Sequence, residues 1–479
     1  MQWVSVRLYI SDSKVMKKKN ITYIVLFIVF IIVLIFPAIQ MKYNLFELKP
    51  LKGSTNPVEV KFNFENYKNN TFQSQVNDYL RYNFGFRELL IRFYNQYTWD
   101  FYKKVENKTV FFGKDNWLFF YDHLLDHYES ITYKYADSCE EMGSIFERDA
   151  RLTYCLQKIL KEYGVTLFVG IAPSKDQLYS EFLPENKQFG RQPCQTSYDF
   201  YERRLREIGV NCIDINAIFK GLMDSVDYPL FYKSSSHYSL VSAAYQTDTL
   251  IRYMENISGL NMVNVECGEF KVGAVQDIDR DMENLFNLMR PIEKTDYYYV
   301  DVKSIPDSNA IKPRWLTVGD SFFWNLINQI PRHEIFTKTP YWYYNKEIYF
   351  DPGHNYTSDV DMLTELLSVD FVMLYWCPIN MYDLEHDFLI KAIESLCFED
   401  NTNQPDKDKL IQYIMTDEKW YNSIVEQAES RGLSIDEMLS RTAEYTIEMR
   451  RKEHLDIILG DSLPTCRNSR IQSILENKK

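Results

Sequence analysis

The longest apolar stretch of the chain lies near its beginning, where residues 21–39 read ITYIVLFIVFIIVLIFPAI and carry no charge. A run of this length predicts a helix that crosses a bilayer, because lipid offers no hydrogen-bond partners to an open backbone. Lys17, Lys18 and Lys19 precede the run, and basic residues stay on the cytoplasmic side of a membrane. We therefore expect residues 1–20 to be a cytoplasmic tail and residues 21–39 an uncleaved anchor.

A cleaved signal peptide is the competing interpretation of the same run. Its apolar core would be shorter and would end in small residues, whereas this run ends in Phe36-Pro37-Ala38-Ile39. Met16 lies just before the lysines, so residues 1–15 are interpreted as an overextended start. The expected location is a bacterial inner membrane, crossed once, with the main domain in the periplasm or otherwise outside the cell membrane.

Beyond the anchor, the pattern changes from polar to helical and then to short strands. Residues 40–75 are polar, contain two prolines and are interpreted as a linker. Apolar residues then recur at three- and four-residue steps as far as residue 94, with an interruption at Gly85, which predicts two helices. Residues 110–121, VFFGKDNWLFFY, predict two short strands around a turn at 113–116.

Five later segments are rich in apolar residues, as expected of strands buried in a parallel sheet. They are residues 166–173, 210–215, 315–319, 346–350 and 370–376. A helical pattern at 145–163 precedes the first of them, and helical patterns at 196–208 and 238–255 separate the first three. Strands that alternate with helices predict a doubly wound α/β sheet. We assign residues 76–397 to this domain, and the charged, helical residues 398–479 to a C-terminal appendage.

Composition and charge exclude several functional classes. The net charge is −13 and no basic stripe is present, so nucleic acid is not an expected partner. None of the eight cysteines forms a CxxC pair, which excludes zinc ribbons and thioredoxin-type sites and leaves disulfides and buried thiols both open. His123 and His127 are four residues apart but lack a third ligand, so neither a metal nor a cofactor is expected.

The sharpest chemical motif is Gly319-Asp320-Ser321, where a predicted strand gives way to a predicted helix. Ligands bind at the carboxyl ends of parallel strands, and backbone N–H groups there stabilise a developing oxyanion. Ser321 is therefore the candidate nucleophile, with its own N–H as oxyanion donor, although a helix N-cap would also suit a serine. A serine nucleophile needs a base, and both His237 and His354 lie at element ends.

Five segments in matching order resemble the SGNH hydrolase-like domains of alginate O-acetyltransferases, also called DHHW proteins. They are NFGFR (83–87), VFFGKDNWLF (110–119), PSK (173–175) with FLP (182–184), YKSSSHYS (232–239) and GDSF (319–322). The resemblance implies an SGNH/flavodoxin-like fold, in which Ser321 takes an acetyl group as an ester and His237 acts as general base. The acetyl group would pass to hydroxyls of a cell-envelope or secreted polysaccharide. Its donor would be a multi-pass membrane-bound O-acyltransferase.

Two positions depart from the family pattern. The Asp that precedes the catalytic His by two residues is Ser235 here, and the Trp that follows the His is Tyr238. In serine proteases, neutralising the orienting carboxylate costs about 10⁴ in rate. Asp320 and Asp351 are therefore candidates for the missing acid. Two functions remain as alternatives, namely an SGNH-type esterase and a catalytically impaired polysaccharide-binding or scaffold partner of a membrane-bound O-acyltransferase.

The remaining candidates are a rival base and two residues of the same cleft. His354 follows Asp351 by three residues, as in ordinary SGNH esterases, which makes this pair the alternative base and acid. Lys175, in the PSK segment, and Asn380, after the last predicted strand, are candidate oxyanion or substrate residues.

Overall fold

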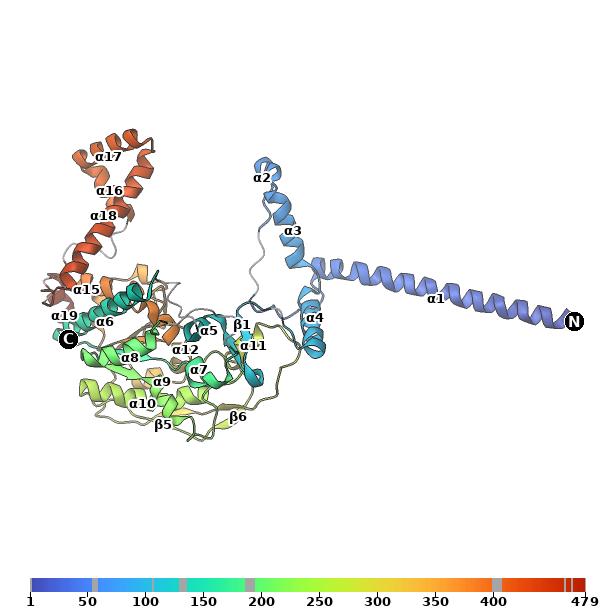
Figure 1. Ribbon diagram of the computed structural model, residues 1–479, viewed down its shortest axis with the longest axis horizontal. Coiled ribbons are helices and arrows are strands. Elements are labelled where there is room, and N and C mark those ends of the chain that lie inside the picture. Colours follow the sequence, from blue (N-terminus) through green and yellow to red (C-terminus); the bar gives the residue numbers. More distant parts are fainter. Residues whose placement is uncertain are drawn as a thin grey trace. The chain divides into compact units, whose positions relative to one another are not determined.

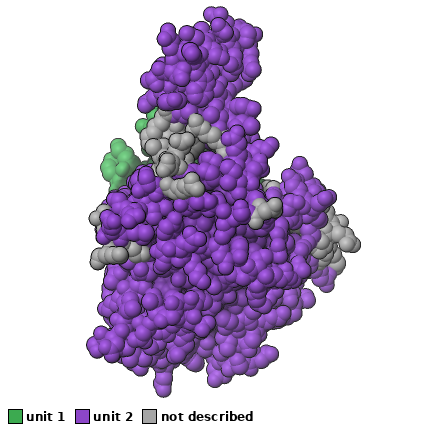
Figure 2. Space-filling view, turned by 90° about the vertical axis from the view of Figure 1, so that its left-hand side faces the viewer, with its two compact units in different colours: residues 1–108, 281–294 green, residues 109–280, 295–479 purple. Residues whose placement is uncertain are grey.

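The computed structural model describes residues 2–53, 59–105, 107–128, 136–185, 194–398, 407–460, 462–466 and 468–478. The chain divides into two compact units, residues 1–108 with 281–294 and residues 109–280 with 295–479 (Figure 2). The second unit holds all the candidate site residues. The boundaries proposed for the tail, anchor, linker, domain and appendage stay predictions.

The first unit is helical. It contains α1 (Gln2–Tyr43), α2 (Phe64–Lys68), α3 (Thr71–Asn83), α4 (Arg87–Tyr102) and the short α11 (Asp281–Asn284) (Figure 1). Within α1, residues 21–43 are long and apolar enough to cross a membrane, which fits a single-pass anchor or a signal. The two helices predicted on either side of Gly85 are α3 and α4. Gly85 is required there, because a Cβ would lie 1.9 Å from the Pro37 carbonyl oxygen.

The second unit is built on a six-stranded sheet in the order β11-β10-β9-β12-β3-β4. Five strands are parallel, with β12 and β9 at the centre. The strands are β3 (Thr166–Ile171), β4 (Cys212–Asp214), β9 (Trp315–Gly319), β10 (Tyr341–Tyr343), β11 (Glu347–Tyr349) and β12 (Phe371–Trp376). The SGNH-like α/β fold predicted from the sequence is confirmed.

One predicted strand has a different place from the expected one. The segment at 346–350 is not another parallel strand, because β11 pairs antiparallel with β10, which the sequence analysis missed. Only three residues separate the two strands, and a parallel connection needs a crossover of a dozen or more. Tyr344 and Asn345 both have positive φ angles, 48° and 51°, which produce the tight reversal.

Helices cover both faces of the sheet, and alternate residues of each strand pack on opposite faces. In β12, Val372 and Leu374 pack in one core, whereas Met373 and Tyr375 pack in the other. Removal of these side chains from water stabilises each face, by about 1.5–3 kcal/mol for each large apolar group. The first face carries α6 (Cys139–Glu162), α8 (Ser197–Glu207), α14 (Met362–Ser368) and α15 (Leu389–Cys397), and the second carries α9 (Ile215–Leu222), α10 (Leu240–Ser258) and α12 (Phe323–Ile327).

Short elements complete the unit. The predicted hairpin at 110–121 is present as β1 (Val110–Phe112) and β2 (Leu118–Phe120), joined by η1 (Lys114–Asn116). Two further antiparallel pairs are β5 (Val265–Cys267) with β8 (Val302–Ser304) and β6 (Lys271–Gly273) with β7 (Tyr297–Tyr299). The connecting turns are α5 (Tyr121–Tyr128), α7 (Lys175–Leu178), η3 (Ser180–Phe182), η4 (Asp277–Arg280), α13 (Arg332–Ile335), η5 (Thr357–Asp359) and η6 (Pro378–Asp383).

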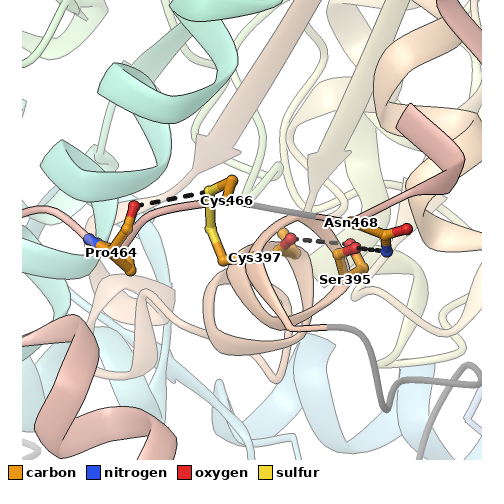
Figure 3. The surroundings of a disulfide bond; sticks show 6 residues. Ser395, Cys397, Pro464, Cys466 and Asn468 are labelled. Carbon is orange, nitrogen blue, oxygen red and sulfur yellow. Dashed lines mark hydrogen bonds between the residues drawn. A yellow bond between two sulfur atoms is a disulfide. The ribbon is translucent and has the colours of Figure 1, made fainter. Parts of the chain in front are cut away.

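The C-terminal region is helical, as predicted. Helices α16 (Lys407–Thr416), α17 (Glu418–Arg431) and α18 (Ile435–Ile458) share a small core of their own, and α19 (Arg470–Lys478) follows. Ile458 and Ile471 return to the core of the sheet. A disulfide joins Cys397, at the end of α15, to Cys466 (Figure 3). Asn468 continues this attachment, since its Nδ2 donates to the Ser395 carbonyl at 2.9 Å.

The structure also contains a second disulfide, which the sequence left undecided. Cys139, the first residue of α6, pairs with Cys194. Cys155, Cys212, Cys267 and Cys377 are free thiols.

Candidate active site

The turn that carries Ser321 follows directly from β9. Gly319 lies so close to β12 that a Cβ would be 2.4 Å from the Tyr375 carbonyl oxygen, so no larger residue fits. Ser321 itself is partly exposed and precedes α12. Among the described residues, its N–H has no acceptor, whereas the Phe322 N–H donates to Asp320 Oδ1 at 3.0 Å. The Ser321 N–H is therefore available to an incoming oxyanion.

Asp320 ties this turn to the end of β12. Its carboxylate is buried, and Oδ2 accepts from the Cys377 N–H at 2.8 Å and from Asn380 Nδ2 at 2.7 Å. Burial raises the pKa of Asp320, and these donors oppose that shift. The Asp320 carboxylate thus holds the turn that carries Ser321 and does not take the place of the family Asp that is missing at position 235. Asn380 likewise directs its amide at Asp320 and at the Tyr344 hydroxyl, 3.3 Å away.

His237 lies on the loop that leads into α10, and its ring faces Ser321. The distance from His237 Nε2 to Ser321 Oγ is 3.0 Å, a hydrogen-bond length that suits a candidate base and a candidate nucleophile. Both residues are partly exposed, so a substrate can reach them. The two sequence-predicted residues, 84 positions apart, are thereby brought together at the carboxyl edge of the sheet.

Ser235, in the position of the family Asp, does not reach the imidazole nitrogen. Its Oγ accepts from the His237 backbone N–H at 3.0 Å and donates to the Ile278 carbonyl at 2.8 Å. Ser236 Oγ instead lies 3.0 Å from His237 Nδ1. If Nε2 takes the serine proton, Nδ1 carries the hydrogen of the neutral ring and donates it to Ser236. Ser235 therefore does not accept a hydrogen bond from the imidazole, because its hydroxyl is occupied by backbone groups.

Two side chains that were not assigned from the sequence connect the loop that carries His237 to the turn that carries Ser321. Tyr238 is buried, and its hydroxyl donates to the Phe322 carbonyl at 3.0 Å. Asn325, in α12, donates from Nδ2 to the Tyr238 carbonyl at 2.6 Å. A hydroxyl in place of the indole of the family pattern thus cross-links the two halves of the site. The replacement of the family Trp by Tyr238 was the feature of the sequence that could have indicated this contact.

Lys175 supports the same loop from below. Its ammonium group is buried and donates to the carbonyls of Tyr232, Lys233 and Ser235 at 3.0, 2.8 and 2.7 Å. It also lies 5.0 Å from the centre of the Trp117 ring, a cation–π contact. The carbonyl groups of three residues beside the base are therefore held by one cation.

We predict that Lys175→Met lowers the free energy of unfolding by about 3 kcal/mol, because the buried carbonyls lose a charged donor. Activity falls as well, since the loop that positions His237 loosens. Thermal unfolding of the detergent-solubilised chain measures the first effect. Lys220→Met, at an exposed position in α9, is the matched control and should change stability by less than about 0.5 kcal/mol. Equal effects of the two substitutions would contradict this role.

The rival pair lies elsewhere. His354 follows β11, and its Nδ1 is 3.4 Å from Asp351 Oδ2. Asp351 also lies 3.9 Å from the Lys338 ammonium. The hydrogen-bond partner that the described residues provide for Ser321 Oγ is His237. The structure does not bring His354 and Asp351 together with the nucleophile.

A polar hollow of about 620 Å³ lies at the carboxyl edge of the sheet, where Ser321 also lies. Tyr344 connects it to the nucleophile turn, because its N–H donates to the Gly319 carbonyl at 2.9 Å. The hollow is lined by polar and aromatic side chains: Tyr344, Asn345, Lys346, Tyr356, Thr357, Ser358, Asp383, Glu385, His386, Asp387 and Lys391.

Glu385 makes the stability of this region depend on pH. Burial and the nearby Asp149 carboxylate raise the pKa of Glu385 to about 7, from 4.5. Because of the raised pKa, the folded chain binds the Glu385 proton more tightly than the unfolded chain does. This contribution to the free energy of unfolding is present below pH 4.5 and is lost as the pH rises through 7. We predict that Glu385→Gln raises the free energy of unfolding relative to wild type, and that this gain is about 2 kcal/mol larger at pH 8 than at pH 5. Melting temperatures at both pH values test this, and an unchanged difference would contradict it.

The two histidines at four-residue spacing do not converge on a metal site. His123 lies in α5 and its Nδ1 is 2.7 Å from the buried Asp176 Oδ1, while the His127 ring contacts Tyr128 edge-on. Within the described ranges, no group of three His, Cys, Asp or Glu side chains is arranged to hold a metal ion.

Comparison with known proteins adds a family to this geometry. The family model described as "SGNH hydrolase-like domain, acetyltransferase AlgX" matches residues 110–310. Residues 110–310 of the chain are thus similar to the SGNH hydrolase-like domain of this acetyltransferase family. The matched part of the SGNH domain includes Lys175, His237 and Tyr238, and it ends before β9 and Ser321. The resemblance predicted from the five segments is thereby confirmed.

Solved structures similar to the chain include three bacterial proteins. The O-acetyltransferase domain of AlgJ from Pseudomonas putida is 15% identical, with 58% of this chain and 93% of that chain covered and a TM-score of 0.37. AlgX of Pseudomonas aeruginosa is 13% identical, with coverages of 60% and 66% and a TM-score of 0.39. PatB1 of Bacillus cereus is 14% identical, with coverages of 57% and 97% and a TM-score of 0.33. No curated protein matches the sequence of the chain.

Proposed function

We propose that this chain is an extracytoplasmic O-acetyltransferase that moves an acetyl group through a Ser321 ester to hydroxyls of a cell-envelope or secreted polysaccharide. The observation that carries the proposal is the 3.0 Å contact between His237 Nε2 and Ser321 Oγ, and His237 lies within residues 110–310, which match the acetyltransferase family model. A nucleophile and a base within hydrogen-bond reach are what acyl transfer requires.

In the first half-reaction, Ser321 Oγ attacks the carbonyl carbon of the donated acetyl group while His237 Nε2 takes the hydroxyl proton. The carbonyl oxygen becomes an oxyanion, which the Ser321 N–H stabilises. The tetrahedral intermediate then expels the leaving oxygen of the donor, which receives the proton from His237. Ser236 Oγ at Nδ1 and the Phe322 ring, 4.7 Å from the imidazole centre, keep the base in position.

In the second half-reaction, a sugar hydroxyl takes the place of the donor. It attacks the acetyl carbonyl of the Ser321 ester, gives its proton to His237, and releases Ser321, which regains that proton. The polar hollow beside Tyr344 is where we place the acceptor, because hydroxyl-rich sugars suit polar groups interspersed with aromatic rings. The polymer thus approaches along the carboxyl edge of the sheet.

The proposed location rests on two features. Residues 21–43 fit a single-pass anchor, and three lysines precede them, which favours a cytoplasmic N-terminus. The disulfides Cys139–Cys194 and Cys397–Cys466 suit an oxidising compartment outside the cytoplasm. A chain of this kind needs acetyl groups brought across the membrane, so we propose a multi-pass membrane-bound O-acyltransferase as donor partner.

The test uses the purified full-length chain with an activated acetyl ester and an acetyl-free oligosaccharide acceptor. We expect the peptide that contains Ser321 to gain the mass of one acetyl group, and the acceptor then to become acetylated. Release of acetate to water with no acetylated sugar would show an esterase instead. No labelling of Ser321 by either the ester or a serine-directed sulfonyl reagent would leave a polysaccharide-binding or scaffold role and overturn the proposal.

A further inference from the structure

Helix α4 exposes a row of apolar side chains, whereas its Trp99 is buried. Their fractional exposures lie between 42% and 72%, and their three- and four-residue spacing places them along one face. This exposed α4 face consists of Leu89, Leu90, Phe93, Tyr94, Tyr97 and Phe101. A helix of a water-soluble domain turns such a face toward the core, so the arrangement of α4 is inverted. Apolar patches of this size mark surfaces that meet another molecule or a membrane.

Hydrogen bonds on the opposite side fix the rotation of α4. Arg92 donates to the Lys49 and Pro50 carbonyls, both at 2.8 Å. Asn95 Nδ2 donates to the Phe286 carbonyl at 2.8 Å, and the buried Gln96 accepts from the backbone N–H groups of residues 289 and 290 at 3.1 and 2.9 Å. The polar residues of the helix are therefore used within the first unit. The apolar side cannot turn inward without breaking these bonds.

The start of α4 is attached to the outer end of the apolar helix. Gly85 packs against the Pro37 backbone, and the Phe86 ring lies 5.0 Å from that of Phe36 and 5.9 Å from that of Phe46. Figure 1 shows α4 running across the end of α1. If α1 spans the membrane, a helix that crosses its end lies along the membrane surface. Sixteen residues extend this contact by about 24 Å.

We propose that the exposed α4 face is embedded in the outer leaflet of the membrane, at the level of the lipid headgroups. The proposal rests on the proposed anchor role of α1. Lipid is the occupant that the structure favours, because the face continues directly from a lipid-exposed helix through the cluster of Phe36, Phe46 and Phe86. Tyr94 and Tyr97 are amphipathic rings of the kind enriched at this depth. The exposed Lys103 and Lys104 end the helix with charges that suit anionic headgroups.

The experiment maps lipid contacts on the full-length chain in vesicles of phosphatidylethanolamine and phosphatidylglycerol that contain a photoactivatable phospholipid. After irradiation, lipid adducts are located by peptide mass spectrometry. We expect adducts on residues 21–43 and on residues 87–102, and none on the exposed surface of α17. Adducts on residues 21–43 alone would overturn the α4 inference while supporting the anchor. Adducts on neither segment would show that the anchor proposal itself is wrong.

A matched pair of variants makes the result specific. Leu90→Glu with Phe93→Glu changes two exposed residues of α4 and should reduce adducts on residues 87–102 about tenfold, leaving those on residues 21–43 unchanged. Tyr413→Glu changes an equally exposed aromatic residue in α16 and should leave both sets unchanged. If the double variant keeps its α4 adducts, these side chains do not contact lipid. Full adduct formation in α1 shows that the variant chain is still inserted.

Discussion

Replacement of Ser321 by Ala is expected to lower kcat for acetyl transfer by about 10⁶-fold, the loss seen when a serine nucleophile that works with a histidine is removed. Without Oγ no acetyl ester can form, and the base 3.0 Å away has no proton to accept. The rate of oligosaccharide acetylation measures the loss, and the mass of the peptide that contains residue 321 shows whether the ester still forms. Binding of the acceptor should persist.

Ser430→Ala is the control for this substitution. Ser430 is exposed in α17, so its loss should leave acetylation and stability within error of wild type. A Ser321→Ala chain that keeps more than a hundredth of the wild-type rate would show that another group carries the acetyl. Ser321 is partly exposed, and its hydrogen-bond partner among the described residues is the His237 side chain, so the variant is expected to melt within about 2 °C of wild type.

His237→Asn is expected to reduce kcat by about 10⁴-fold or more, because Ser321 then has no base at hydrogen-bond distance. The structure supplies a matched control in His354, the rival base, which pairs with Asp351 instead. His354→Asn should leave the rate within about twofold of wild type. Side-by-side kinetics of the two variants decide between the bases. If His354→Asn is the slower enzyme, the proposed assignment of the base is wrong.

Much of the fold could be predicted from the sequence, because buried parallel strands consist of consecutive apolar residues. The strands at 166–171, 315–319 and 371–376 were predicted in this way. The place of the candidate nucleophile, Ser321, was also readable, because a Gly-Asp-Ser that follows such a strand lies at its carboxyl end. His237 came from the ordered family segments, since spacing along a chain says nothing of which loops meet at one edge of a sheet.

The rest depended on three-dimensional details that residue types do not specify. Ser235 and Ser236 are both serines beside a histidine, and which hydroxyl reaches Nδ1 depends on the local backbone path. The strand at 341–343 was missed because its aromatic YWY triplet has no strong period, and its antiparallel neighbour was misplaced as a result. Lys175 was a candidate oxyanion or substrate residue, and the carbonyl groups that its ammonium contacts could not be read from the sequence.

The bridge between Cys397 and Cys466 has a topological consequence. The two bridged cysteines are 69 positions apart in the sequence. The segment between them therefore begins and ends at the same disulfide on the sheet domain. Helices α16 and α17 and the start of α18 therefore behave as a cassette, whose sequence can vary without moving any strand, whereas the end of α18 packs on the sheet through Ile458. Exchange of that cassette between proteins would change what surrounds the sheet domain while leaving the arrangement of its strands intact.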